Sequence, residues 1–113
     1  MQITENIEGG VAIIALEGNL MTDEDSDALQ NRVDALGLDR VVLKLRGIHM
    51  ISSRGISALL VCAKNLRTSG GDLRLADLTD RAYHILVEVT QLGTNFQIFN
   101  TVDEAVASFA ENQ

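Results

Sequence analysis

Two adjacent serines, Ser52 and Ser53, stand between a run of strand-forming residues and an apolar segment with helical spacing. A serine hydroxyl at such a junction can cap the open N-terminus of the helix, or it can accept a phosphoryl group. Capping alone is the simpler interpretation, but one serine is enough for it. Gly55, in the first helical turn, also costs helix stability unless something must come close to the backbone. This segment is therefore the first candidate for function.

The other reactive side chains are interpreted as structural. His49, His84 and Cys62 are isolated from one another and from any carboxylate at metal-ligand spacing. The acidic run at 23–27 lacks the spacing of a calcium loop and suits the positive end of a helix dipole. Gly70-Gly71 is typical of a helix end followed by a turn rather than a phosphate-binding loop. We therefore expect no catalytic residue, no metal site and no cofactor.

Composition narrows the class of partner. The chain has 113 residues and 46% hydrophobic content, which predicts one globular domain over residues 1–113. A net charge of −7 opposes direct binding to nucleic acid. There is no uncharged apolar run long enough for membrane insertion and no secretory signal pattern, and the single cysteine suits a reducing compartment. The expected protein is cytoplasmic and binds other proteins or small molecules.

The hydrophobic pattern alternates between strand and helix. Strand-like runs occur at 3–7, 11–17, 40–45, 72–76 and 96–99, and the first two are joined by a glycine turn. Helical spacing follows Thr22, Ser53, Thr79 and Thr101. The order β-β-α-β-α-β-α-β-α predicts an α/β fold with a mostly parallel sheet and an antiparallel first strand.

Each expected helix has an apolar face that should point into the core. In the third, Ala82, Ile85, Leu86 and Val89 are expected inward. The second is expected to bury Leu59, among others. These faces would pack the helices against the sheet.

The segment Ser52-Ser53-Arg54-Gly55-Ile56-Ser57-Ala58-Leu59-Leu60 resembles the signature of STAS domains of the anti-anti-sigma factor type. Leu16-Glu17-Gly18-Asn19-Leu20 is similar to the family's second strand and its Gly-x-Leu turn, and Gly70-Gly71-Asp72-Leu73-Arg74-Leu75-Ala76 to its glycine turn and following strand. The order and spacing of these pieces cover nearly the whole chain. The resemblance therefore implies a single STAS-like domain.

The resemblance also implies a mechanism. In this family the serine at the position of Ser53 is phosphorylated by an anti-sigma factor that is a serine kinase. In this chain the adjacent Ser52 is the alternative acceptor. The unphosphorylated form binds the kinase, phosphorylation ends that binding, and a serine phosphatase is a further expected partner. The implied partner-binding residues are Gly18, Asn19, Leu20, Met21, Thr22, Ser52, Arg54, Gly55 and Ser57.

Three positions depart from the family pattern. Ser52 stands where an acidic residue usually precedes the phosphoacceptor, Arg54 where a small hydroxyl residue is usual, and Met21 where an acidic residue often follows Gly-x-Leu. Two other interpretations remain open. One is an unphosphorylated STAS subunit of a larger assembly, such as a lipid-transport complex; the other, less favoured, is an enzyme.

Overall fold

The computed structural model describes residues 1–89 and 96–111, and it has the predicted α/β class. The strands are β1 (Gln2–Glu8), β2 (Val11–Leu20), β3 (Arg40–Ile51), β4 (Asp72–Ala76) and β5 (Ile98–Phe99). The helices are α1 (Asp23–Leu36), α2 (Ser53–Thr68), α3 (Asp80–Tyr83), the π-helix η1 (His84–Val89) and α4 (Val102–Glu111). Within these residues the strands form one sheet in sequential order, with β1 antiparallel to β2 and every other pair parallel.

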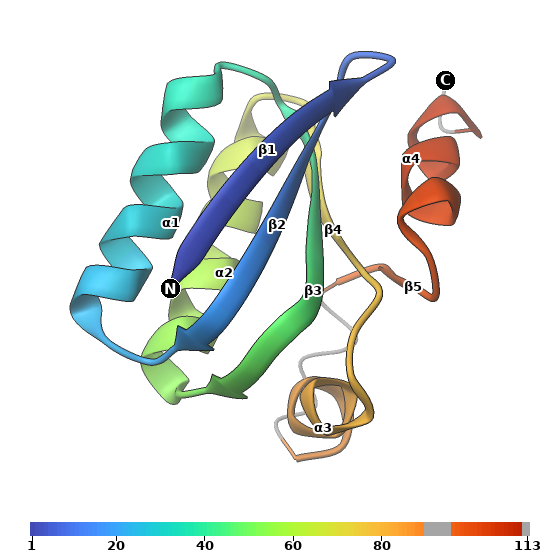
Figure 1. The fold of residues 1–113 in the computed structure, drawn as a ribbon. Helices are drawn as coiled ribbons and strands as arrows, with labels where there is room; N and C mark the ends of the chain where they lie inside the picture. Colours follow the sequence, from blue (N-terminus) through green and yellow to red (C-terminus); the bar gives the residue numbers. More distant parts are fainter. Residues whose placement is uncertain (90–95, 112–113) are drawn as a thin grey trace.

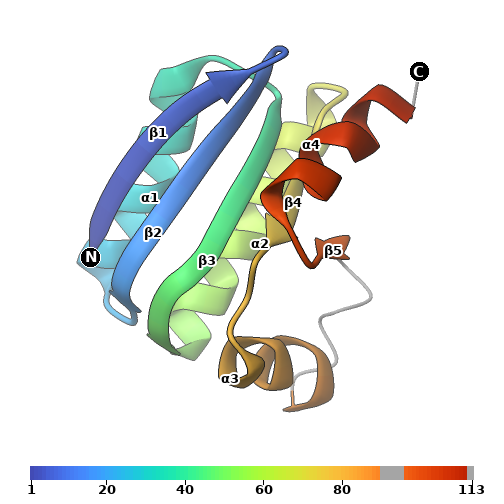
Figure 2. The same ribbon diagram turned by 45° about the vertical axis from the view of Figure 1, so that its right-hand side comes forward.

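The helices form layers on the two faces of the sheet. Helices α1 and α2 lie side by side on one face, and α4 lies on the other (Figures 1 and 2). Both α1 and α2 connect parallel strands, so their shared face follows from the single hand of such crossovers. Helix α2 therefore begins at the edge of the sheet where β2 and β3 end.

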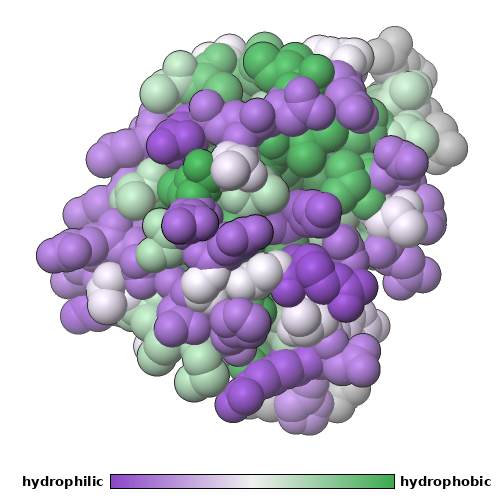
Figure 3. All heavy atoms as spheres, in the orientation of Figure 1, coloured by the Kyte–Doolittle hydropathy of each residue, from purple (hydrophilic) through white to green (hydrophobic). Residues whose placement is uncertain are grey.

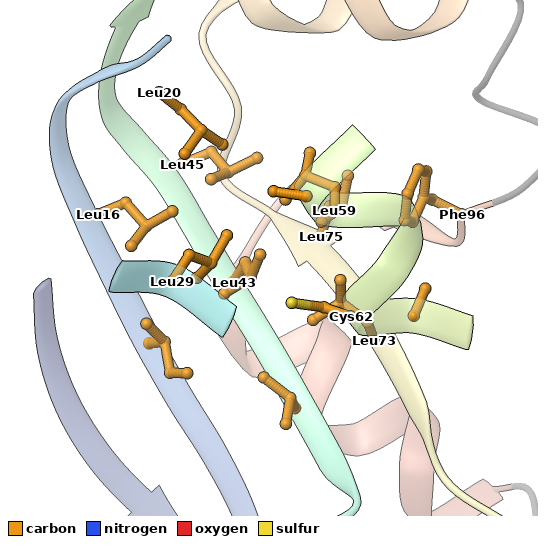
Figure 4. Close-up of a cluster of buried hydrophobic side chains, with 14 of the residues drawn as sticks. Leu16, Leu20, Leu29, Leu43, Leu45, Leu59, Cys62, Leu73, Leu75 and Phe96 are labelled. Atoms are coloured by element: carbon orange, nitrogen blue, oxygen red, sulfur yellow. The ribbon is translucent and has the colours of Figure 1, made fainter. Parts of the chain in front are cut away.

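A large hydrophobic core fills the space between the sheet and the α1–α2 layer. Figure 4 shows side chains from β2, α1, β3, α2 and β4 pointing into it, among them the fully buried Leu20, Leu43 and Leu59. A smaller cluster lies on the opposite face beneath α4, where Phe109 packs on Val11 and Val42. Burial of Leu59 confirms the face predicted for the second helix.

The first hairpin forms as predicted, with a two-residue connection. Gly9 and Gly10 both have positive φ, 57° and 81°. Two successive residues of this kind make the turn that suits the twist of paired strands, and glycine adopts it without steric cost. The hairpin places β1 at the edge of the sheet.

Four sequence expectations were wrong in detail. Strands β2 and β3 continue to Leu20 and Ile51, beyond the expected 11–17 and 40–45. The last strand covers only Ile98–Phe99, and Phe96 instead packs into the main core, 5% exposed. The third helix starts after the Thr79 cap as predicted but changes from α to π geometry at His84. Hydrophobic spacing indicates which face of a helix is buried, but it does not show which backbone hydrogen bonds form. It therefore could not distinguish the α-helix from the π-helix that follows it. Of the four residues expected on the inward face, Ala82 and Leu86 are buried and Ile85 is half-buried. The side chain of Val89 lies outside the described part.

Hydrophilic side chains cover most of the face shown in Figure 3, with smaller hydrophobic areas between them. Among the described residues, no helix combines the length and the apolar character that crossing a bilayer requires.

Candidate functional site

Ser52 caps helix α2 and ties it to the end of β2. Its Oγ accepts a hydrogen bond from the Gly55 N–H (3.3 Å) and donates one to the Met21 carbonyl (2.7 Å). Its own N–H donates to the Leu20 carbonyl at 3.0 Å. The Ser52 hydroxyl therefore already acts as both donor and acceptor within the fold.

Ser53 is the first residue of α2, and its side chain is exposed. Within residues 1–89 and 96–111, no other group makes a hydrogen bond with its hydroxyl. The first N–H groups of a helix have no partner inside it, so this hydroxyl stands beside the positive end of the helix dipole. Ser52 thus caps the helix, whereas Ser53 faces solvent.

Gly55 is buried directly under this helix start. A Cβ at this position would lie 2.2 Å from the Leu20 carbonyl oxygen and 2.9 Å from Leu20 Cγ. The close approach that the sequence indicated is therefore made by β2, not by a partner. Two of the expected partner-binding residues are therefore buried: Gly55 is covered by β2, and Leu20 is 0% exposed.

The Gly-x-Leu segment expected to form a turn belongs to a strand. Gly18, Asn19 and Leu20 belong to β2, and the pairing register with β3 shifts between Gly18 and Asn19. Gly18 has a φ of 110°, which suits this irregularity better than a residue with a side chain would. A glycine inside a strand was thus interpreted as a turn. Met21 alone links β2 to the Thr22 cap of α1, and its side chain is exposed.

A reciprocal capping box fixes the start of α1 beside this linker. The Asp25 N–H donates to Thr22 Oγ1 (3.1 Å), and Asp25 Oδ2 accepts from the N–H groups of Met21 (3.0 Å) and Thr22 (3.1 Å). These backbone hydrogen bonds lower the pKa of the Asp25 carboxyl below its usual value, because they stabilise its charged form. The backbone of the 21–22 linker is therefore held in place.

Arg54 joins the two helix starts. Its guanidinium makes an ion pair and hydrogen bond with the Asp23 carboxylate of α1, and both side chains are exposed. The sequence indicated Asp23 only as part of a helix start, because a pair separated by 31 positions is invisible without the fold. The positive charge of Arg54, which stands next to Ser53, is thus balanced by Asp23.

Met50 is a residue that sequence reasoning missed. It lies in β3 opposite Asn19 and is 38% exposed, much like Met21 at 37%. Ser57, one helical turn beyond Ser53, is also exposed. We define the Ser53 surface as the exposed residues Asn19, Met21, Met50, Ser53, Arg54 and Ser57. It lies at the lower end of Figure 1, where β2 and β3 end and α2 begins.

The two histidines and the cysteine show no arrangement typical of a metal site or a reactive thiol in the described part of the chain. His49 and His84 are exposed, and the described part of the chain contains no group of three potential metal ligands. Cys62 is buried in α2, where burial raises the pKa of its thiol to about 11, with a smaller contribution from the nearby Asp34 charge. A buried thiol with this pKa is a poor nucleophile at neutral pH.

Known proteins match this fold over nearly its whole length. The family model for the STAS domain matches residues 2–105, and the chain belongs to this family. A relative in Bordetella bronchiseptica, described as the anti-sigma factor antagonist BtrV, is 33% identical over 112 residues, covering 96% of this chain and 95% of the relative.

Solved structures show the same fold at lower identity. A Thermotoga maritima protein described as an anti-sigma factor antagonist superposes with a TM-score of 0.84 at 21% identity, covering 94% of this chain and 92% of that one. The anti-sigma factor antagonist SpoIIAA in its unphosphorylated form gives a TM-score of 0.78 at 14% identity, covering 97% of each chain. The predicted family and fold class are confirmed.

Proposed function

We propose that this protein is an anti-anti-sigma factor: it binds an anti-sigma factor that is a serine kinase, and phosphorylation of Ser53 ends that binding. The observation that carries the proposal is the division between the two serines. Ser52 is committed to the fold, whereas Ser53 is exposed and has a hydroxyl that the described fold does not use. The relative described as an anti-sigma factor antagonist supports the choice of partner.

The Ser53 surface has the chemistry of a regulated protein interface. Met21 and Met50 offer flexible apolar area beside small polar groups, a composition that suits contact with another protein. Ser53 and Ser57 lie one turn apart on α2, and each adds an exposed hydroxyl. A partner can therefore cover Ser53 while packing on the methionines.

Phosphorylation would change this surface without changing the fold. A phosphate adds about −1.5 to −2 charge at neutral pH, and the start of a helix accommodates an anion. Because no residue in the described part of the chain makes a hydrogen bond with Ser53 Oγ, phosphorylation breaks none there, and the cap and the core stay intact. A partner packed on the neutral hydroxyl would instead have to bury an unpaired charge, which is costly. Removal of the phosphate by a serine phosphatase would restore binding.

The test is a pull-down with the serine kinase encoded nearest to this protein's gene. Wild type and Ser53→Ala should be retained, because neither carries a charge at the site. Ser53→Asp should lose most of the binding, and Ser57→Asp is the matched control for an added charge one turn away. We expect a larger loss for Ser53→Asp than for Ser57→Asp.

Two results would contradict the proposal. Equal retention of Ser53→Asp and wild type would remove the charge-based switch. Failure of all variants to bind any kinase encoded nearby would favour a STAS subunit that assembles without phosphorylation.

A further inference from the structure

A hollow lies between helices α1 and α2, at the end of this helix layer that is far from Ser53. Its volume is about 500 Å³, and its lining comes from the C-terminal parts of both helices and from residues 37–39. Both helices end at this place because each connects parallel strands of one sheet and therefore runs in the same direction (Figure 1). The hollow is thus a consequence of the topology.

The floor of the hollow is apolar and packed on the main core. Val33 is 4% exposed and Leu66 is 8% exposed, and both belong to the core cluster. The half-buried Leu38 packs against the same cluster. An apolar group that enters the hollow would therefore leave water and contact side chains that are already fixed in place.

Cys62 adds one polar atom to this floor. Its side chain is 3% exposed, and its sulfur points toward α1 (Figure 4). No group in the described part of the chain makes a hydrogen bond with the thiol. Burial raises the pKa of the thiol, and the charge of Asp34 raises it further, so this carboxylate lies close enough to act on the floor. The neutral thiol is left to contact a ligand as a weak donor or acceptor.

The rim of the hollow carries two carboxylates that lack a positive partner. Asp34 and Asp39 are both exposed, and neither makes an ion pair within residues 1–89 and 96–111. None of the residues that line the hollow is basic. Arg67, in the last turn of α2, lies outside the lining, and its Nε donates to Asp72. Two negative charges thus stand above an apolar floor.

The two helix ends strengthen this negative potential. The last carbonyls of a helix have no partner inside it, and the C-terminus carries a partial charge of about −0.5. At the end of α1 the Gly37 N–H donates to the Asp34 carbonyl (3.3 Å), and the last turn contains no basic residue. Because α1 and α2 end on the same hollow, both contributions attract a cation there.

We propose that this hollow binds a small organic cation, namely a primary ammonium group carried on an apolar body. The ammonium group pairs with the carboxylates of Asp34 and Asp39, and the body covers the apolar floor. The volume lies in the range of small-molecule sites, which favours a free amine over a single side chain of a partner protein. This site is separate from the Ser53 surface and does not depend on the function proposed for it.

The test is a ¹H–¹⁵N NMR titration of the whole chain at neutral pH and constant ionic strength. Benzylamine, benzyl alcohol and benzoate share one apolar body and are cationic, neutral and anionic. We expect saturable shifts of the Gly37, Cys62 and Ser69 amides with benzylamine. The alcohol should bind more weakly, and benzoate about tenfold more weakly or less, because its charge meets two carboxylates.

Asp34→Asn and Asp39→Asn should each weaken the binding of benzylamine about two- to fivefold, the effect of one exposed ion pair. Neither carboxylate makes a hydrogen bond in the described part of the chain, so both variants should fold. If the spectrum of Asp34→Asn shows an altered fold, Asp39→Asn decides. Asp27→Asn is the matched control, because Asp27 is an exposed carboxylate two turns earlier on α1 and does not line the hollow. It should leave the affinity nearly unchanged.

Several results would overturn the proposal. Equal weakening by Asp27→Asn would reduce the effect to general charge, and equal affinity for the alcohol or for benzoate would remove the selection of a cation. Absence of saturable shifts at the hollow with benzylamine contradicts it directly. Saturation by an end-capped lysine peptide but not by benzylamine would assign the hollow to a partner protein instead.

Discussion

The two ends of helix α2 share a close backbone approach at a glycine but differ in how their side chains are bound. At each end a glycine lets the helix approach a neighbouring backbone: Gly55 beneath the Leu20 carbonyl and Gly71 beneath the Asp39 carbonyl. At the far end the surrounding side chains bind one another, with Asp72 holding both Arg67 and Arg74. At the near end the Ser53 hydroxyl is left outside the described network.

This difference shows where a charge can be added without disturbing the hydrogen bonds of the fold. A charge added at Ser53 disturbs no hydrogen bond of the cap, because Ser52 alone forms it. A charge change at Asp72 would instead leave two arginines without a shared acceptor, one of them almost fully buried. The near end therefore tolerates an added charge, whereas the far end depends on its ion pairs.

The comparison requires α2 to be a rigid element anchored at its middle. Leu59 is fully buried there, so Leu59→Ala should lower the free energy of unfolding by about 2–5 kcal/mol. Equilibrium denaturation in urea measures it. A loss below about 0.5 kcal/mol, the range of surface substitutions, would mean that this face of α2 does not carry the packing.

Gly55→Ala tests the close approach at the near end. Alanine is the better helix former by about 1 kcal/mol, yet its Cβ would meet the Leu20 carbonyl at 2.2 Å. We expect a net loss of about 1–3 kcal/mol in unfolding free energy, typical of overpacking. Ser57→Ala, on the exposed side of the same helix, is the control and should change stability little. A Gly55→Ala protein more stable than wild type would show that nothing presses on this position.

Replacing Ser52 and replacing Ser53 should have different effects on the free energy of unfolding. Ser52→Ala removes the cap and the bond to the Met21 carbonyl, and should cost about 1 kcal/mol. Ser53→Ala removes no hydrogen bond of the described fold and should stay within about 0.5 kcal/mol of wild type. Thermal unfolding of the pair under identical conditions decides. The assignment of the cap is wrong if the two losses are equal or reversed.

Asp25 gives the smallest expected effect, and one that depends on pH. Its folded-state pKa is lowered, so the stability that its charge contributes is present above the unfolded value of about 3.9 and is lost as pH falls through the lowered value. Asp25→Asn keeps the shape and an acceptor but not the charge. At pH 6 wild type should have a larger free energy of unfolding than this variant, and the difference should shrink below about pH 4. A difference that stays constant over this range would exclude the carboxylate charge as its cause.

The sequence predicted the element order, the family and the serine pair, because these rest on local signals: hydrophobic spacing, capping residues and glycine turns. It did not predict which serine caps the helix, since both are good caps and only the position of Met21 decides between them. It also placed Leu20 and Gly55 at the partner surface, although they pack on each other inside. The Arg54–Asp23 pair and the Arg74–Ser108 hydrogen bond join segments far apart in the chain, and no local pattern reports such contacts.

The most direct test of the central claim is to locate the phosphate. The chain is incubated with ATP and the serine kinase encoded nearest to its gene, and intact mass with fragment-ion mapping then counts and places the added groups. The account predicts one phosphate on Ser53 in wild type, the same in a folded Ser52→Ala protein, and none in Ser53→Ala. Phosphate that persists in Ser53→Ala and disappears in Ser52→Ala, or a chain that accepts none, would contradict it.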